Sequence, residues 1–237
     1  MAGAYIVDKA KILENFKKTI TLVRGKKYTF KVSGVEEDGT MHPFYLTSSI
    51  TGGAGFPGVI TENVEHSYER NKDPYFTTDD TSVITKTGFT YDAVSDHYEV
   101  NLAGSYEKSL RFRWTEDIRK LTLDRYYLIT YKVQIASGSL RLRCGVTKGK
   151  IRSTIGTETY SEVLQMKSLS QFRDIMIIGD KLFTGAVKEV SVREVGMTSG
   201  DFVFIPSYEH PDTIYYQCGS HENMGGTIKL INEPGAI

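Results

Sequence analysis

The stretch that decides the fold is residues 213–226, TIYYQCGSHENMGG, which runs directly into TIKLI at residues 227–231. Two runs of β-branched and aromatic residues flank a Gly-rich segment, a pattern that predicts two strands joined by a tight loop. The loop carries Cys218, His221 and Met224, separated from one another by two residues each. A thiolate, an imidazole and a thioether on one short loop form a soft donor set, which is typical of a copper site.

A further donor, His42, lies far upstream at the start of HPFYLT, residues 42–47. This segment reads as a strand that begins with a proline near its edge. One loop can supply three ligands, but a fourth ligand must come from an adjacent strand. We therefore expect the strand at residues 42–47 to lie beside the strand at residues 213–217.

In these segments the chain resembles the cupredoxin family, and its C-x2-H-x2-M spacing is similar to that of short-loop members such as amicyanin. The resemblance covers residues 20–60 and 200–232. It implies that His42 and His221 are imidazole ligands of a copper ion, Cys218 the thiolate ligand and Met224 the axial ligand. It also implies an electron-transfer site of the type 1 copper class.

The alternative reading is purely structural. A Cys, a His and a Met in a packed β loop can be core residues, and descendants of this fold can lose the metal. His42 precedes Pro43, and the restriction that a proline places on its neighbour could account for the segment as a turn.

The middle of the chain predicts a series of short strands without helical periodicity, which favours a sandwich or jelly roll. Ser137-Gly138 predicts a hairpin turn between two of these strands. The predicted strands are 83–90, 97–102, 110–114, 126–135, 139–146, 158–166, 174–178 and 186–195.

Residues 95–196 resemble the carbohydrate-binding-module type of jelly roll found in tail and surface proteins of phages. The resemblance rests on YYLITYKV, SGSLRL, GDKLFTG and VKEVSVREV, which share a pattern of apolar and glycine positions. It implies a glycan as a candidate ligand, with Trp114 as a sugar-stacking platform. Trp114 alternates with Phe112 and Leu110, however, and an aromatic residue at strand spacing is more often part of a core.

Together these features predict an all-β chain of two domains. Residues 1–65 and 199–237 are expected to form a discontinuous, cupredoxin-like Greek-key sandwich. Residues 66–198 are expected to form an inserted jelly-roll sandwich. Each domain is long enough to bury a core of its own.

Composition excludes several classes of function. Among 237 residues, Lys plus Arg and Asp plus Glu both number 29, so the net charge is zero and favours neither nucleic acid nor an acidic membrane. No apolar run approaches the roughly 20 residues of a membrane helix. The two cysteines, Cys144 and Cys218, exclude a disulfide framework and leave one bridge between them as an alternative.

No Ser/His/Asp, paired-carboxylate or HExxH arrangement is present, so we expect no enzyme activity. His66, His97 and His210 do not stand at ligand spacing and are expected to be surface or hydrogen-bonded histidines. The N-terminus lacks the pattern of a secretory signal peptide.

The segments RGKKYTF…HPF and YYxCxxHxxMGG are similar to segments of structural proteins in marine and cyanobacterial tailed phages. This resemblance implies a virion protein (a capsid decoration, fibre, or neck or tail accessory) that assembles in the host cytoplasm. Its expected partners are other virion proteins, further copies of itself and host-surface glycans. The alternatives are a type 1 copper protein that transfers electrons and a non-viral sugar-binding module.

Overall fold

The computed structural model describes residues 5–6, 19–34, 41–67, 69–71, 73–114, 120–167 and 173–233. These residues form strands and turns without a helix, so none of them forms a helix long and apolar enough to cross a membrane. The protein is all-β, as predicted. It divides into two compact units: unit 1 is Met1–Tyr68 with Glu194–Ile237, and unit 2 is Glu69–Arg193.

The unit boundaries differ by a few residues from the predicted ones, which fell after residues 65 and 198. The second boundary lies within strand β14 (Thr184–Met197), whose last residues belong to unit 1. A strand that continues through a boundary shows no change of composition there, so the sequence could not place it.

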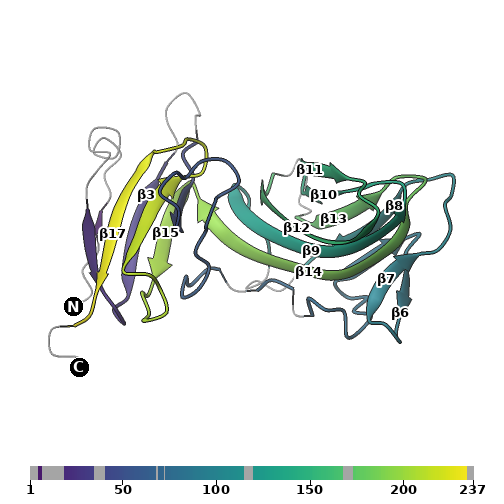
Figure 1. The fold of residues 1–237 in the computed structure, drawn as a ribbon, viewed down its shortest axis with the longest axis horizontal. Coiled ribbons are helices and arrows are strands. Elements are labelled where there is room, and N and C mark those ends of the chain that lie inside the picture. The colour runs from purple at the N-terminus through teal and green to yellow at the C-terminus, as the bar shows by residue number, and fades with distance from the viewer. Residues whose placement is uncertain are drawn as a thin grey trace. The chain divides into compact units, whose positions relative to one another are not determined.

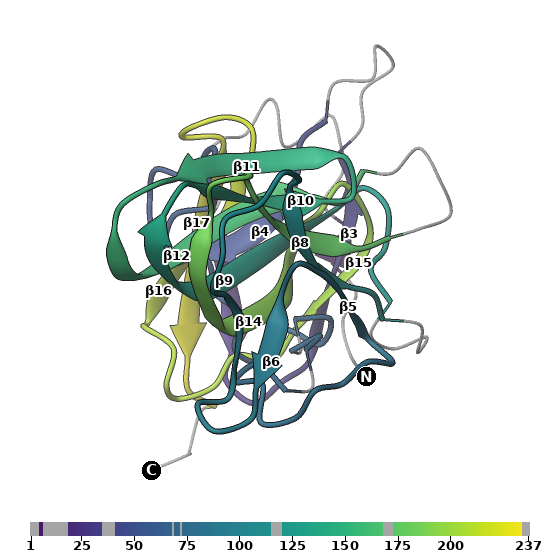
Figure 2. The ribbon, with the colours of Figure 1, turned by 90° about the vertical axis from the view of Figure 1, so that its right-hand side faces the viewer.

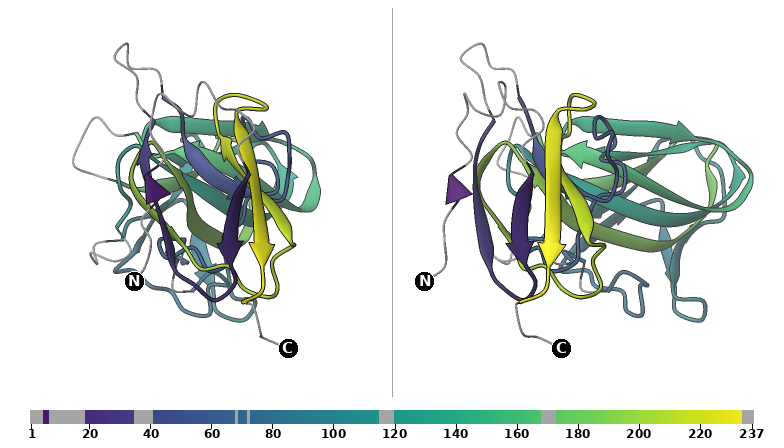
Figure 3. Two further views of the ribbon diagram at one scale, coloured as in Figure 1. Left: turned by 90° about the vertical axis from the view of Figure 1, so that its left-hand side faces the viewer. Right: turned by 60° about the vertical axis from the view of Figure 1, so that its left-hand side comes forward.

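Unit 1 contains two sheets. One sheet has the strand order β1-β3-β15, with β1 at Tyr5–Ile6, β3 at Tyr28–Ser33 and β15 at Ser199–Phe204. The other has the order β4-β16-β17-β2, with β4 at Phe44–Thr47, β16 at Thr213–Cys218, β17 at Gly225–Ile231 and β2 at Ile20–Val23. Strands β2 and β17 are parallel neighbours, visible in Figure 3 as a dark purple and a yellow arrow that point the same way.

The pairing of β4 with β16 joins two distant parts of the sequence. The strands are antiparallel, with Phe44 opposite Cys218 and Leu46 opposite Tyr216. The HPF segment therefore lies directly beside the YYQC segment, as the ligand pattern requires. Strand β16 then turns back into β17, its antiparallel partner, through residues 219–224.

The two sheets of unit 1 share one apolar core. Phe30 of β3, Phe202 of β15 and Phe44 of β4 are all buried. The ring of Phe44 lies 5.4 Å from that of Phe30 and 5.1 Å from that of Phe202, measured between centroids. Burying each phenyl side chain contributes about 1.5–3 kcal/mol. Unit 1 is therefore a β-sandwich closed by aromatic contacts between its layers.

Unit 2 also contains two facing layers, which can be followed in Figure 1. One layer has the order β11-β10-β13-β8-β5, with β11 at Thr147–Arg152, β10 at Leu140–Cys144, β13 at Ile175–Gly179, β8 at Lys108–Phe112 and β5 at Ile84–Thr87. The other contains β12 (Gly156–Gln165), β9 (Arg125–Ser137) and β14, with β7 (His97–Val100) beside β14 and β6 (Thr90–Asp92) beside β7. Strand β5 pairs with β8 at the end of its layer (Figure 2).

The core of unit 2 follows from the alternation of buried and partly exposed residues along strands such as β8, β9 and β10. In β9, Tyr127, Ile129 and Tyr131 are fully buried, while the residues between them are partly exposed. Leu142 of β10 and Ile177 of β13 belong to the same buried cluster from the facing layer. Unit 2 is therefore a second β-sandwich, inserted into the sequence of the first.

The strand predictions differ from the structure in several places. The predicted strand 83–90 is two strands, β5 and β6, because Gly88 between them adopts a positive φ of 72° and turns the chain. Strand β11 was missed because its residues, TKGKIR, are rich in charge and contain a glycine. Strand β2 was also missed.

Candidate metal centre

Three of the four predicted metal ligands converge at one end of β4 and β16. The Sγ atom of Cys218 lies 3.8 Å from Nδ1 of His42 and 3.6 Å from Nδ1 of His221. The three donor atoms all lie within 4.8 Å of one another. The two imidazole rings are 4.9 Å apart between centroids and inclined by 32°.

Strand pairing places His42 beside the thiol. Gly219, next to Cys218, donates its backbone N–H to the carbonyl of Pro43 over 2.7 Å, which extends the β4–β16 ladder toward the ligands. The N–H of His42 donates to the carbonyl of Gly34 over 2.6 Å. A Cβ atom at residue 34 would lie 2.2 Å from the carbonyl oxygen of His42, so only glycine permits this approach.

Backbone hydrogen bonds also close the loop from Cys218 to Met224. The Cys218 N–H donates to the carbonyl of Met224 over 2.7 Å. Asn223 adopts a φ of 58°, a left-handed conformation that asparagine tolerates better than most residues. The N–H of Ser220 points at the Cys218 sulfur over 3.4 Å. The loop thus holds His221 near the thiol from one side, while β4 brings His42 from the other.

The Gly-rich segment at residues 51–58 packs against this ligand loop. Gly53 donates its N–H to the carbonyl of Cys218 over 3.1 Å, and Asn223 donates to the carbonyl of Thr51 over 2.6 Å. The glycine-rich composition of this segment indicates only that it is a loop. Its contacts with the ligand loop were not foreseeable, because no residue type in it marks a partner so far along the sequence.

Phe56, within the same segment, packs against Gly219, the residue that follows Cys218. A Cβ atom at Gly219 would lie 2.3 Å from Cζ of Phe56, so the ring lies flush against this glycine. The ring also lies 4.4 Å, between centroids, from that of the buried Tyr45. The residue that follows Cys218 is therefore packed against a pair of aromatic side chains.

The three donors differ in their access to solvent. Cys218 is buried, His42 is half-buried and His221 is exposed. Burial raises the pKa of the Cys218 thiol, and hydrogen bonds from the backbone of Ser220 and His221 offset this only in part. Without a metal the thiol therefore stays protonated at neutral pH, and a bound metal must displace this proton.

The spacing of the donors fits a single metal ion. Around a trigonal ion, a sulfur at about 2.3 Å and an imidazole nitrogen at about 2.0–2.1 Å lie about 3.7–3.8 Å from each other. The two Sγ–Nδ1 distances, 3.8 Å to His42 and 3.6 Å to His221, lie within about 0.2 Å of this spacing. One thiolate and two imidazoles form the equatorial ligand set of blue-copper proteins.

Met224, the predicted axial ligand, is held next to Cys218 through its backbone carbonyl, and its side chain is half-buried. Its role as a ligand stays a prediction.

The interpretation of Trp114 as a sugar platform is wrong. The side chain is 3% exposed and belongs to the core of unit 2. Its ring stacks on that of Phe112, with centroids 6.1 Å apart and an angle of 17° between the planes. A buried ring offers no face to a sugar, and the alternation with Phe112 and Leu110 reflects the inward side of the strand.

The bridge between Cys144 and Cys218 is also excluded, because both cysteines are free thiols. Cys144 lies in the core of unit 2. His210 is buried and hydrogen-bonded as expected: the N–H of Ser207 donates to its Nδ1 over 2.9 Å.

No protein-family model matches the chain, and no curated protein matches its sequence. Among solved structures, the chain is similar to CBM35 from Paenibacillus barcinonensis, at 10% identity and a TM-score of 0.35 over 53% of this chain and 96% of that one. It is also similar to the CBM22-1 xylan-binding domain of Xyn10C from the same organism, at 14% identity and a TM-score of 0.34 over 54% and 96% of the two chains. A third is TmCBM61, solved with β-1,4-galactotriose, at 13% identity and a TM-score of 0.24 over 59% and 99%. Likenesses this weak identify neither a family nor a ligand for this chain.

Proposed function

We propose that unit 1 binds one copper ion through the thiolate of Cys218 and the imidazoles of His42 and His221, with Met224 as a weak axial ligand. The observation that carries this proposal is the pair of Sγ–Nδ1 distances, 3.6 and 3.8 Å, which suit ligands of a single trigonal ion. The donor set supports copper, since sulfur favours the reduced ion and imidazole the oxidised one.

Electron transfer is the activity that such a site would support. The burial of Cys218 would limit the access of water to the ion, while the exposed His221 would connect it to the surface. The short backbone contacts of His42 and the ligand loop would hold the ligands in place during a change of oxidation state.

The test is a titration of the purified, reduced protein with Cu(II), followed by visible absorption and by the ratio of copper to protein. We expect one copper per chain and an intense blue colour. Cys218→Ser should lose the colour, and His42→Ala should weaken copper binding by more than about tenfold.

Cys144→Ala is the matched control, because it removes the other buried thiol of the chain and should leave the colour intact. Copper binding that is unchanged in Cys218→Ser would refute the proposal, and so would wild-type protein that stays colourless and copper-free.

A structural role in a tailed-phage virion stays a prediction of the sequence resemblance, as do its virion partners, self-association and assembly in the host cytoplasm. Glycan binding by unit 2 likewise stays a prediction, now without Trp114 as its platform. Co-assembly of the Cys218→Ser variant with virion proteins would test the first, and a glycan array the second.

A further inference from the structure

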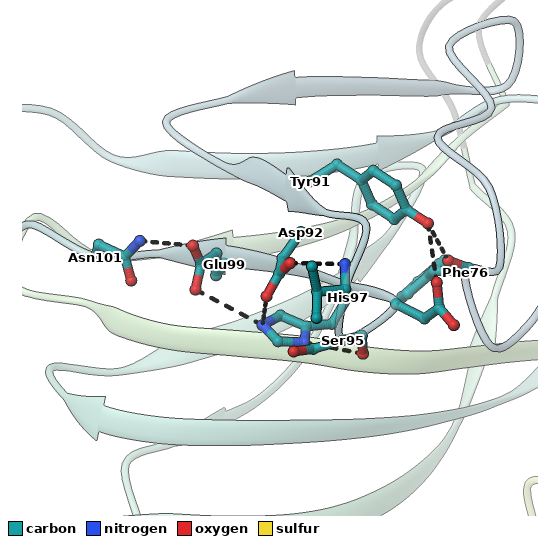
Figure 4. A network of polar contacts seen from close by, with 9 residues as sticks. Phe76, Tyr91, Asp92, Ser95, His97, Glu99 and Asn101 are labelled. Atoms are coloured by element: carbon teal, nitrogen blue, oxygen red, sulfur yellow. Dashed lines mark hydrogen bonds and ion pairs between the residues drawn. The ribbon is translucent and has the colours of Figure 1, made fainter.

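A second group of donor side chains lies on the hairpin of β6 and β7, shown in Figure 4. Asp92 pairs with His97 across the hairpin, and Glu99 follows His97 on the same face of β7. Nε2 of His97 lies 3.9 Å from Oδ2 of Asp92 and 3.7 Å from Oε2 of Glu99. The three donors lie within 4.8 Å of one another. We propose that they form a site for a divalent transition-metal cation of the Zn²⁺ type.

A hydrogen bond to the backbone determines which tautomer the neutral imidazole of His97 adopts. Nδ1 lies 3.2 Å from the carbonyl oxygen of Ser95, which can only accept a hydrogen bond. Nδ1 therefore carries the proton, and in the neutral ring Nε2 presents its lone pair to the two carboxylates. A backbone carbonyl on the second nitrogen is the usual partner of a metal-binding histidine.

Each carboxylate is held in the same manner, through the oxygen that does not face His97. Oδ1 of Asp92 accepts a hydrogen bond from the N–H of Val94 over 2.9 Å. Oε1 of Glu99 accepts one from the side-chain amide of Asn101 over 2.6 Å. Oδ2 of Asp92 and Oε2 of Glu99 are thereby turned toward Nε2 of His97 (Figure 4).

The distances from Nε2 of His97 to the two carboxylates suit ligands of a shared metal ion better than direct hydrogen bonds. At 3.7 and 3.9 Å, the contacts of Nε2 exceed the length of a hydrogen bond. Ligands at about 2.0–2.2 Å from a tetrahedral zinc ion lie about 3.4 Å apart, so an ion would shorten the two contacts of Nε2 by only about 0.3–0.5 Å.

The charge of the three side chains and their exposure to solvent also favour a divalent transition-metal ion. Two carboxylates would balance a divalent cation, and the imidazole selects against Ca²⁺ and Mg²⁺, which prefer oxygen ligands. The side chains of His97, Asp92 and Glu99 are 12%, 29% and 28% exposed, so an ion can reach the site and keep a water as a further ligand.

The hairpin itself is firmly attached to unit 2. Strand β7 pairs with β14, with Tyr98 opposite Val187, and the side chain of Tyr98 is fully buried. The hydroxyl of Tyr91 on β6 donates to the carbonyl of Phe76 over 2.8 Å, as Figure 4 shows. The donors are thus carried on strands anchored by packing, which keeps their spacing fixed.

The test uses ZnCl₂ and the full chain in a Cys218→Ser background, so that the thiol site of unit 1 does not contribute. Calorimetric titration should show one bound zinc ion per chain. His97→Gln should weaken this binding by more than about tenfold, and Glu99→Gln should do so independently. The imidazole NMR signals of His97 should shift when zinc is added.

Glu107→Gln is the matched control, because Glu107 is an exposed acid of unit 2 outside the cluster. The zinc affinity of this variant should equal that of the Cys218→Ser protein. Circular dichroism would establish that each variant is folded, and Glu99→Gln decides the question if His97→Gln does not fold. Absence of zinc binding in the background would overturn the proposal. Zinc binding of equal strength in the variants at residues 97 and 99 would overturn it as well.

Discussion

The two donor clusters of this protein are assembled in opposite ways. In unit 1, His42 and Cys218 are far apart in the sequence and meet only because β4 pairs with β16. In unit 2, Asp92, His97 and Glu99 lie on one hairpin, and the register of that hairpin alone aligns them. The first cluster therefore depends on the complete fold of its unit, whereas the second depends on a local turn.

The largest effect is expected from a substitution in the core of unit 1, which should abolish copper binding and leave zinc binding intact. Phe202→Ala should cost about 3–5 kcal/mol, since Phe202 is fully buried and contacts both Phe30 and Phe44. Copper binding should be lost, and zinc binding on the β6–β7 hairpin should remain. Chemical denaturation with both metal titrations measures this. Simultaneous loss of zinc binding would show that the two units unfold together.

A smaller effect is expected at Gly34, where the backbone passes close to His42. Gly34→Ala should destabilise unit 1 by about 1–3 kcal/mol and weaken copper binding, because the new Cβ would displace the His42 carbonyl. Gly104→Ala is the control, since a Cβ there would meet only the end of Lys108 at 3.7 Å. Equal copper affinity in both variants would contradict the positioning of His42 by this contact.

Asn101 allows the hairpin cluster to be tested without removing a ligand. Asn101→Ala should weaken zinc binding by about tenfold, because the amide orients Glu99 and partners of this kind typically contribute that much. Copper binding should not change. Zinc titrations of the variant and the background provide the comparison, and unchanged zinc affinity would remove Asn101 from the site.

The smallest effect concerns acid stability and belongs to unit 2 alone. Burial raises the pKa of Asp79, but hydrogen bonds from Lys86 and Tyr98 outweigh it, so the pKa is lowered. A carboxylate with a lowered pKa stabilises the fold above its unfolded pKa, near 4, and this contribution is lost as pH falls through the folded pKa. Asp79→Asn should therefore cost about 1 kcal/mol at pH 7 and progressively less below about pH 4.

Denaturation curves of wild type and Asp79→Asn at several pH values check this expectation. A difference in stability that does not shrink as the pH falls below about 4 would contradict it, because the unfolded carboxyl group then binds a proton that the folded one resists.

The sequence predicted the fold best where a set of metal ligands required particular strands to be neighbours. The ligand pattern around Cys218 required a neighbouring strand with His42, and this requirement predicted the β4–β16 pairing across the inserted unit. The series of short strands without helical periodicity likewise predicted a sandwich in the middle of the chain. The unit boundaries were less certain, because β14 continues through one of them.

The close contacts around the metal centre could not be predicted, because they depend on the detailed backbone conformation of the segments that meet there. The approach of Gly34 to His42 and the packing of Phe56 on Gly219 leave no mark in the residue types. His97 was interpreted as a surface or hydrogen-bonded histidine. Its relation to Asp92 depends on the hairpin register, which includes a positive φ of 49° at Asp96.

The pairing of β4 with β16 also fixes an order of events during synthesis. The ribosome makes β4 first, then all of unit 2, and only afterwards the strand that ends in Cys218. Unit 2 can complete its sandwich before β15, β16 and β17, the remaining strands of unit 1, have been made. A chain that stalls within unit 2 would carry His42 without Cys218, so the proposed copper site could form only after Cys218 has been made.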